Sequence, residues 1–220
     1  MLSINQPRKL STHKAVILGD GGVGKTSITT QFVRQYFVET YDPTDDDNYR
    51  KQIEVDGEPC LVEVLEVASS AEYEALRSLW TREGEVFMIV FSLSSRSSFT
   101  RAKNYYQQIQ DVKKTTVPLI LVGNKCDRAP ELHEVSPQEG ESLAREFGCT
   151  FMMTSAKCNK NIDEAFAHLI RLNVKQREEQ RAKETAAAIT SEPQGNEVEK
   201  KGWKKRLSSL LTSLGKGNRG

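Results

Sequence analysis

The feature that most constrains the fold of this chain is a glycine-rich loop between a short apolar run and an amphipathic segment. The loop reads GDGGVGKT, from Gly19 to Thr26, and matches the pattern GxxxxGK[ST]. HKAVILGD before it predicts a strand, and KTSITTQFVRQYF after it predicts a helix over residues 25–37. Glycines let successive backbone N–H groups turn toward phosphate oxygens, and the helix N-terminus adds its positive dipole end. The predicted phosphate site comprises Gly19, Gly21, Gly22, Val23, Gly24, Lys25, Thr26 and Ser27.

Two side chains at the end of this loop carry the expected chemistry. Lys25 supplies a positive charge for phosphate, and the Thr26 hydroxyl is a suitable ligand for Mg²⁺. The alternative is a glycine-rich turn with a surface lysine. The strand before the loop and the helix after it favour the phosphate site, because both are where this motif requires them.

Strand and helix patterns alternate along the remaining chain. Apolar or alternating runs predict strands at 48–55, 58–67, 85–93, 117–124 and 151–156, with a hairpin turn at Asp56-Gly57. Helical patterns cover 71–82, 97–114, 136–148 and 161–183. This order predicts an α/β domain whose sheet is mostly parallel with one antiparallel strand, and whose helices lie on both faces.

Two further motifs follow predicted strands and select a base. Asn124-Lys125-Cys126-Asp127 comes after one buried strand, and Ser155-Ala156-Lys157 comes after the last. The Asp127 carboxylate can accept hydrogen bonds from N1–H and the 2-amino group of guanine, whereas adenine offers neither donor. A polar site of this kind discriminates strongly against a ligand that leaves it unpaired. An ATP-dependent enzyme is therefore disfavoured, although each motif taken alone is weak.

The chain resembles Ras-type small GTPases over residues 13–175, through GDGGVGKTS, YFVETYDPT, NYRKQIEVDGE, VGNKCD and TSAK. The resemblance implies a six-stranded Ras-like P-loop NTPase fold that binds GTP or GDP with Mg²⁺. It also implies roles for phosphate-binding Lys25, metal-binding Thr26 and Thr44, base-packing Phe37, and Asn124, Lys125, Asp127, Ser155, Ala156 and Lys157 around the guanine. Lys25 and Thr44 would be the catalytic residues.

The chain departs from this family after the third predicted strand. Where the family has DTAGQE, this sequence has Glu66-Val67-Ala68-Ser69-Ser70-Ala71. Glu66 stands at the position of an aspartate that holds Mg²⁺ indirectly, and its carboxylate is about one C–C bond further out. Ser70 replaces the glutamine that orients the attacking water, and phosphoryl transfer depends mainly on such positioning. We expect nucleotide binding to persist with weakened hydrolysis; the alternatives are a non-hydrolysing scaffold and an ordinary GTPase that tolerates serine.

The family resemblance also implies exchange factors and effectors as partners. Their expected contacts are the two switch regions, Thr44–Tyr49 and Tyr73–Trp80. Asp45 replaces an apolar residue of Ras within the acidic stretch 45–47, so the identity of the effector does not carry over. A solvated acidic loop is the alternative interpretation of this stretch.

Charge is distributed unevenly along the 220 residues. Residues 200–220 hold seven basic and no acidic side chains, which leaves 24 basic against 30 acidic over residues 1–199. An acidic body argues against nucleic-acid binding. The predicted organisation is an N-terminal extension (1–12), a Ras-like domain (13–175), a polar linker (176–199) and a basic amphipathic tail (200–220). Four cysteines without metal-ligand spacing, and the absence of an apolar span, favour the cytoplasm.

The tail offers a surface contact of its own. No cysteine follows Cys158, so a prenylated or palmitoylated end is not expected. On a helix, Trp203 and the leucines up to Leu214 fall within one arc of about 100°, with basic residues beside them. This pattern favours the cytoplasmic face of an anionic membrane. A groove on a partner protein and a disordered basic end remain alternatives.

Overall fold

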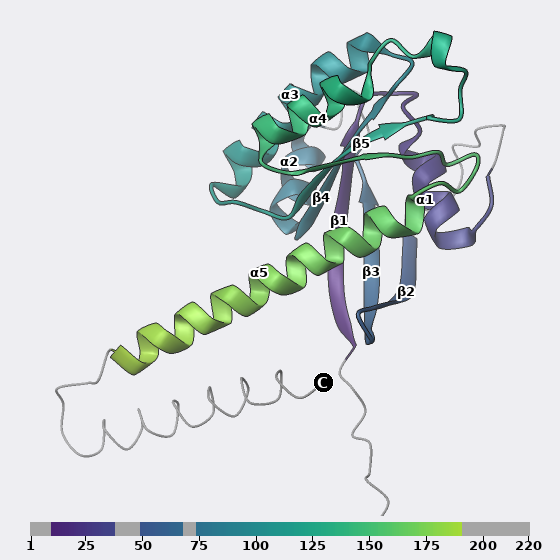
Figure 1. Cartoon of the computed structure of the whole chain (residues 1–220). Helices are drawn as coiled ribbons and strands as arrows, with labels where there is room; N and C mark the ends of the chain where they lie inside the picture. Colours follow the sequence, from purple (N-terminus) through teal and green to yellow (C-terminus); the bar gives the residue numbers. More distant parts are fainter. Residues whose placement is uncertain (1–9, 38–48, 68–73, 191–220) are drawn as a thin grey trace, which may run out of the picture. The chain divides into compact units, whose positions relative to one another are not determined.

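A computed structural model describes residues 10–37, 49–67 and 74–190 of the chain. The chain divides into two compact units, Met1–Asn173 and Val174–Gly220. Figure 1 shows the described elements in sequence colours. They are, in order, β1 (Ser11–Gly19), α1 (Lys25–Arg34), β2 (Tyr49–Val55), β3 (Glu58–Glu66), α2 (Glu74–Glu83), β4 (Val86–Ser92), α3 (Arg96–Lys113), β5 (Leu119–Asn124), the 3₁₀ turn η2 (Pro130–Leu132), α4 (Pro137–Phe147), β6 (Thr150–Met153) and α5 (Ile162–Thr190).

The first unit is built on one six-stranded sheet with the order β2-β3-β1-β4-β5-β6. Only the pairing of β2 with β3 is antiparallel, and the other neighbours are parallel. This confirms the predicted mostly parallel α/β fold with one antiparallel strand. Parallel β1, β3, β4, β5 and β6 bring their carboxyl ends to the same edge, which is where ligands bind in open α/β sheets.

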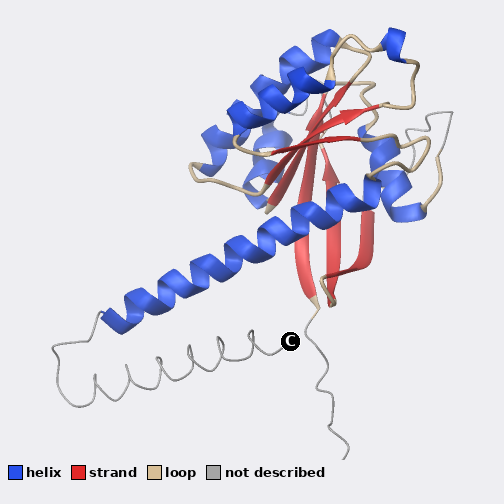
Figure 2. Ribbon diagram, viewed as in Figure 1, coloured by secondary structure: helices blue, strands red, loops and turns tan. Residues whose placement is uncertain are grey.

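The central strands are buried on both faces, as continuous apolar runs predict. Successive residues of β1 alternate between two cores, with Ala15 and Ile17 in one and Val16 and Leu18 in the other. Helix α1 and the first part of α5 cover one face, and α2, α3 and α4 cover the other (Figure 2). These two cores hold the strand ends, and the loops that follow them, in fixed register.

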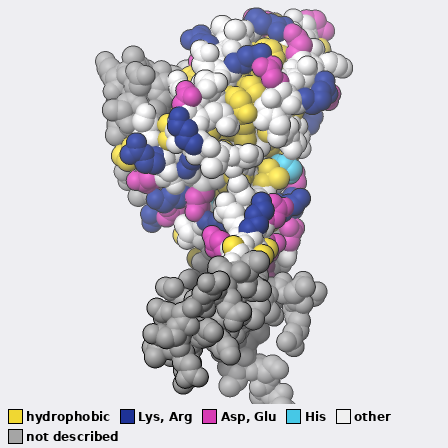
Figure 3. All heavy atoms as spheres, turned by 90° about the vertical axis from the view of Figure 1, so that its left-hand side faces the viewer, with side chains coloured by type: hydrophobic (Ala, Val, Ile, Leu, Met, Phe, Trp, Pro, Cys, Tyr) yellow, Lys and Arg dark blue, Asp and Glu magenta, His cyan; other side chains and the backbone are white. Residues whose placement is uncertain are grey.

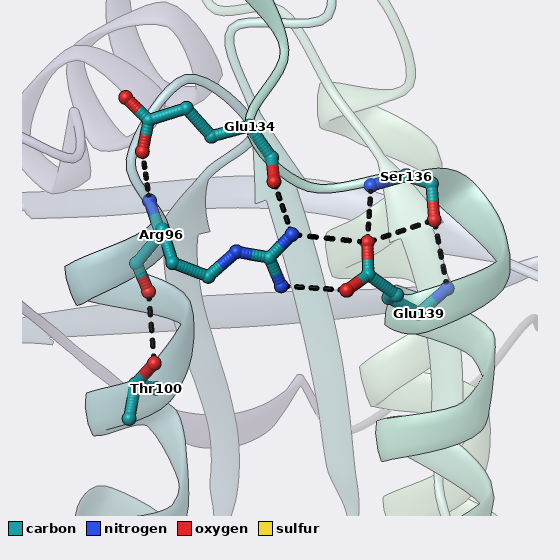
Figure 4. Close-up of polar contacts among 5 residues, drawn as sticks. All are labelled: Arg96, Thr100, Glu134, Ser136 and Glu139. Atoms are coloured by element: carbon teal, nitrogen blue, oxygen red, sulfur yellow. Dashed lines mark hydrogen bonds and ion pairs between the residues drawn. The ribbon is translucent and has the colours of Figure 1, made fainter.

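The start of α4 illustrates how local sequence and tertiary packing combine. Ser136 and Glu139 form a capping box: the Ser136 hydroxyl accepts from the Glu139 N–H, and the Glu139 carboxylate accepts from the Ser136 N–H. Gly148 ends the helix in the left-handed conformation, which glycine adopts without steric cost. Arg96 of α3 adds a tertiary contact, because its Nη1 lies 2.6 Å from Glu139 Oε1 and its Nη2 donates to the Glu134 carbonyl (Figure 4).

Several predicted boundaries are wrong. Strand β1 begins at Ser11, inside the predicted extension, because Ser11 and Thr12 pair with β3. Helix α1 ends at Arg34 rather than residue 37, because Gln35 adopts a left-handed conformation with φ 59°. Helix α5 continues to Thr190, beyond its predicted end at Lys183 and through much of the segment predicted as a polar linker. Its ETAAAIT stretch contains three alanines and no glycine or proline, so nothing there interrupts a helix.

The surface carries charges of both signs. On the face shown in Figure 3, Lys and Arg side chains alternate with Asp and Glu rather than gathering by sign. Several form exposed ion pairs, including Lys103 with Glu146 and Lys14 with Glu83. Among the helices of the described residues, none is both long and apolar enough to cross a membrane.

Candidate functional site

The phosphate loop connects the end of β1 to the start of α1, and two of its glycines are required by geometry. Gly19 has φ 153°, and an added Cβ would lie 2.2 Å from the Val90 carbonyl oxygen. Gly24 has φ 98° and forms the N-cap of α1, where a Cβ would lie 2.5 Å from Asn124 Nδ2. A side chain at either position would collide with its neighbour and strain the backbone. The loop thus keeps backbone close to β4 and β5 while leading into a helix N-terminus.

Lys25 lies across this loop. Its Nζ donates to the carbonyl oxygens of Gly19, at 2.9 Å, and Asp20, at 2.8 Å. Burial lowers the pKa of Lys25, while the nearby carboxylates of Glu66 and Asp20 act in the opposite direction. The ammonium group is therefore held at the centre of the loop, partly removed from water, where attraction to an anion is stronger than in bulk solvent.

Thr26 and Glu66 form the part of the site suited to a divalent cation. Glu66 is the last residue of β3, paired with Ile17 of β1, and its Oε2 accepts a hydrogen bond of 2.7 Å from the Thr26 hydroxyl. A hydroxyl and a carboxylate side by side are the hard oxygen ligands that Mg²⁺ prefers. These two residues therefore fit a magnesium ion beside the phosphate loop, and when bound the ion would neutralise phosphate charge.

Asn124 links the phosphate loop to the loop after β6. Its side chain is buried, with Nδ2 donating to the Val23 carbonyl at 2.9 Å and Oδ1 accepting from the Thr154 hydroxyl at 3.2 Å. Lys125 adds a second tie, since its Nζ donates to the Gly22 carbonyl at 2.6 Å. Burial lowers the pKa of Lys125, with Arg128 acting in the same direction. The base motif and the phosphate loop are thereby joined directly.

Asp127 is oriented by the third motif. The Ser155 hydroxyl donates to Asp127 Oδ1 at 2.6 Å and accepts from the Cys158 N–H at 3.0 Å. Ala156 follows in a buried position. A short bond from a neutral hydroxyl leaves the carboxylate able to accept further donors while fixing its direction. The sequence placed Ser155 near the base, but its role as the residue that aims Asp127 appears only in the structure.

The remaining predicted site residues fall into two groups. Ser27 lies in the first turn of α1, Phe37 packs against the core beneath α1 and α5, and Lys157 is exposed. Thr44 and Ser70 lie outside the described residues. So do the acidic stretch 45–47, Ser69 and the tail segment 203–214. The switch predicted at Tyr73–Trp80 is described in part, as the beginning of α2.

Sequence reasoning missed three residues that contact one another behind the loop. The buried carboxylate of Asp20 accepts from the Tyr105 hydroxyl at 3.0 Å and pairs with Arg101 Nε at 2.8 Å. Arg101 and Tyr105 are four residues apart, hence on one face of α3. That spacing is visible in the sequence, but nothing local shows that Asp20 is the partner of this face.

A phosphate loop and a base motif joined at the carboxyl edge of a parallel sheet define a P-loop nucleotide-binding domain. Comparison with known proteins agrees and is more specific. The model of the Ras family matches residues 14–175. The chain is 47% identical to Protein ras-2 of Neurospora crassa over an alignment length of 209, which covers 86% of this chain and 89% of that protein. The chain is 45% identical to Ras-like protein 1 of Pyricularia oryzae over an alignment length of 227, which covers 94% of this chain and 90% of that protein.

A third relative, Ras-like protein B of Aspergillus fumigatus, is 44% identical over 195 residues, covering 78% of this chain and 81% of that protein. The chain belongs to the Ras family of small GTPases. Members of this family bind guanine nucleotides with Mg²⁺ and signal through exchange factors and effectors.

Proposed function

We propose that this Ras-like switch binds GTP and GDP with Mg²⁺ but hydrolyses GTP slowly. The observation that carries the proposal is the position of Glu66 at the end of β3, bonded to Thr26 beside the phosphate loop. This register supports the alignment of Glu66 with the family's metal-site aspartate. On that alignment Ser70, four residues onward in the sequence, is proposed to replace the family's water-orienting glutamine.

The chemical consequence follows from what each group contributes to phosphoryl transfer. Phosphate charge would be stabilised by Lys25, by the N–H groups of the loop and by a metal ion. Lys25 and the candidate metal ligands Thr26 and Glu66 all lie at the phosphate loop. Serine is too short to align water as a carboxamide does. An arginine supplied by an activating partner is worth roughly 10³–10⁵ in rate, but that gain requires a positioned nucleophile. The chain therefore supports tight nucleotide binding and weak turnover.

Single-turnover hydrolysis of [γ-³²P]GTP tests this proposal. We expect the parent protein to hydrolyse slowly and Ser70→Gln to raise the rate at least tenfold, with a further gain when Ser69→Gly is added. Ser142→Gln, the same change on the exposed surface of α4, serves as the matched control and should leave the rate unchanged. Normal basal and activator-stimulated rates in the parent protein would disprove slow hydrolysis without questioning nucleotide binding.

The partners and location proposed for this switch rest on its sequence. The acidic stretch 45–47 fits an effector surface with basic residues at its rim, because opposite charges favour such an edge contact. The basic amphipathic segment 203–214 fits the anionic cytoplasmic face of a membrane. Co-sedimentation with vesicles containing phosphatidylserine tests the second point. Equal recovery of the protein in the supernatant with and without vesicles would exclude it.

A further inference from the structure

Asp20 places a negative charge within the loop that receives phosphate. Its side chain is only 9% exposed, and it points away from the loop toward α3. A carboxylate this close to a polyanion opposes binding unless its charge is balanced, because charges in partly buried sites are weakly screened. Lys25 interacts with this charge, but its Nζ donates to the loop carbonyls rather than to the Asp20 carboxylate, so a cation bonded directly to the carboxylate would balance it further.

Arg101 supplies that cation from α3. Its Nε lies 2.8 Å from Asp20 Oδ2, while more than half of the arginine side chain remains in water. The Tyr105 hydroxyl donates to the other carboxylate oxygen at 3.0 Å. Both oxygens of Asp20 are thus directed to one helix face, and the negative charge is drawn away from the space that phosphates would enter.

Asp20 also helps to hold Lys25, through its backbone carbonyl. The backbone carbonyl of Asp20 accepts from Lys25 Nζ at 2.8 Å, so one residue makes both the side-chain contact with α3 and the carbonyl contact with Lys25. Moving the side chain of Asp20 would shift the carbonyl that positions the ammonium group. Helix α3 is thereby connected to the phosphate loop through Asp20.

We propose that Arg101, aided by Tyr105, is a positioning residue that sets nucleotide affinity by balancing the charge of Asp20 and fixing the phosphate loop. The proposal rests on nucleotide binding at this loop and adds a determinant of its strength. It predicts two signatures that general loosening of the fold would not produce. The effect of losing Arg101 should grow with the phosphate charge of the ligand, and it should disappear when Asp20 is also neutral.

Release of mant-labelled nucleotides from the full chain in magnesium buffer provides the test. Arg101→Gln should release mantGDP about tenfold faster than the parent, which corresponds to about 1.4 kcal/mol, and should accelerate release of mantGppNHp by a larger factor. Tyr105→Phe should accelerate mantGDP release about threefold. Lys103→Gln is the matched control, since Lys103 lies on the same helix and forms an exposed ion pair with Glu146 of α4; it should match the parent.

The double variant Asp20→Ala/Arg101→Gln decides the mechanism. If the double variant releases mantGDP within about twofold of the rate of Asp20→Ala alone, charge balance is supported. A double variant that folds when Arg101→Gln alone does not fold supports it as well. Equal acceleration of both nucleotides by Arg101→Gln, or a double variant as fast as Arg101→Gln, would overturn the inference. A parent chain that binds mantGDP normally but shows no response to Arg101→Gln overturns this inference alone. A parent chain that fails to bind mantGDP overturns the proposed function as well.

Discussion

Thr154→Val removes a single hydroxyl from the junction between the base motif and the phosphate loop. The Thr154 hydroxyl is buried and donates to Asn124 Oδ1 at 3.2 Å, while Asn124 Nδ2 donates to the Val23 carbonyl. Valine has nearly the same shape as threonine. The backbone of residue 154 also makes two hydrogen bonds that do not depend on the side chain: its N–H donates to the Gly123 carbonyl, and its carbonyl accepts from the Cys126 N–H. The change therefore isolates one buried hydrogen bond.

The expected loss follows from leaving a buried acceptor without this donor. Replacing one partner in such a pair costs about 1–3 kcal/mol, compared with a total stability of roughly 5–15 kcal/mol for a domain. For a chain of this size each kcal/mol corresponds to about 2–4 °C in Tm. Because Asn124 also contacts Val23 of the phosphate loop, GDP release should accelerate in parallel with the loss of stability.

Urea unfolding at saturating GDP and Mg²⁺ measures the effect. Thr150→Val is the matched control: it makes the same substitution in β6, where the hydroxyl is exposed and contacts His168 Nε2 at 3.0 Å. That variant should change the free energy of unfolding by less than about 0.5 kcal/mol, with the urea m-value of both variants unchanged. Equal free-energy losses for the two variants would refute the reasoning, because burial would then carry no weight.

Two further changes test the metal site and the start of α4. Glu66→Asp should lower several-fold the Mg²⁺ concentration needed for half of the maximal slowing of mantGDP release, because Mg²⁺ tolerates little displacement of a ligand from octahedral geometry. A higher Mg²⁺ concentration for the variant than for the parent would show that the longer side chain suits the ion. Arg96 first, and then hydrogen bonds from Ser136, lower the pKa of Glu139 to about 2. A lowered folded-state pKa stabilises the fold above the ordinary value of 4.5, and this contribution is lost as pH falls through about 2. Glu139→Gln should therefore be less stable than the parent in urea at pH 7, with the difference narrowing toward pH 2.5; a difference independent of pH would contradict this assignment.

Local signals predicted the elements because their causes are local. The continuous apolar run at 85–93 contains the fully buried β4, and the helical pattern predicted at 136–148 contains α4. The ends of α1 and α5 were predicted less well. A left-handed Gln35 has no strong signal in its residue type, and the helical preference of alanine at the end of α5 outweighed the polar composition that suggested a linker.

The sequence by itself determined the phosphate loop, the base motif and their order after successive strands, because glycine spacing and hydrophobic periodicity are properties of neighbouring residues. Only the tertiary structure decided which side chains meet: Asn124 with Val23, and Asp20 with Arg101. These partners are about 80 to 100 residues apart, and they are brought together by strand order and register in the sheet. A contact of that kind depends on the packing of every element between its partners, so no short stretch of sequence encodes it.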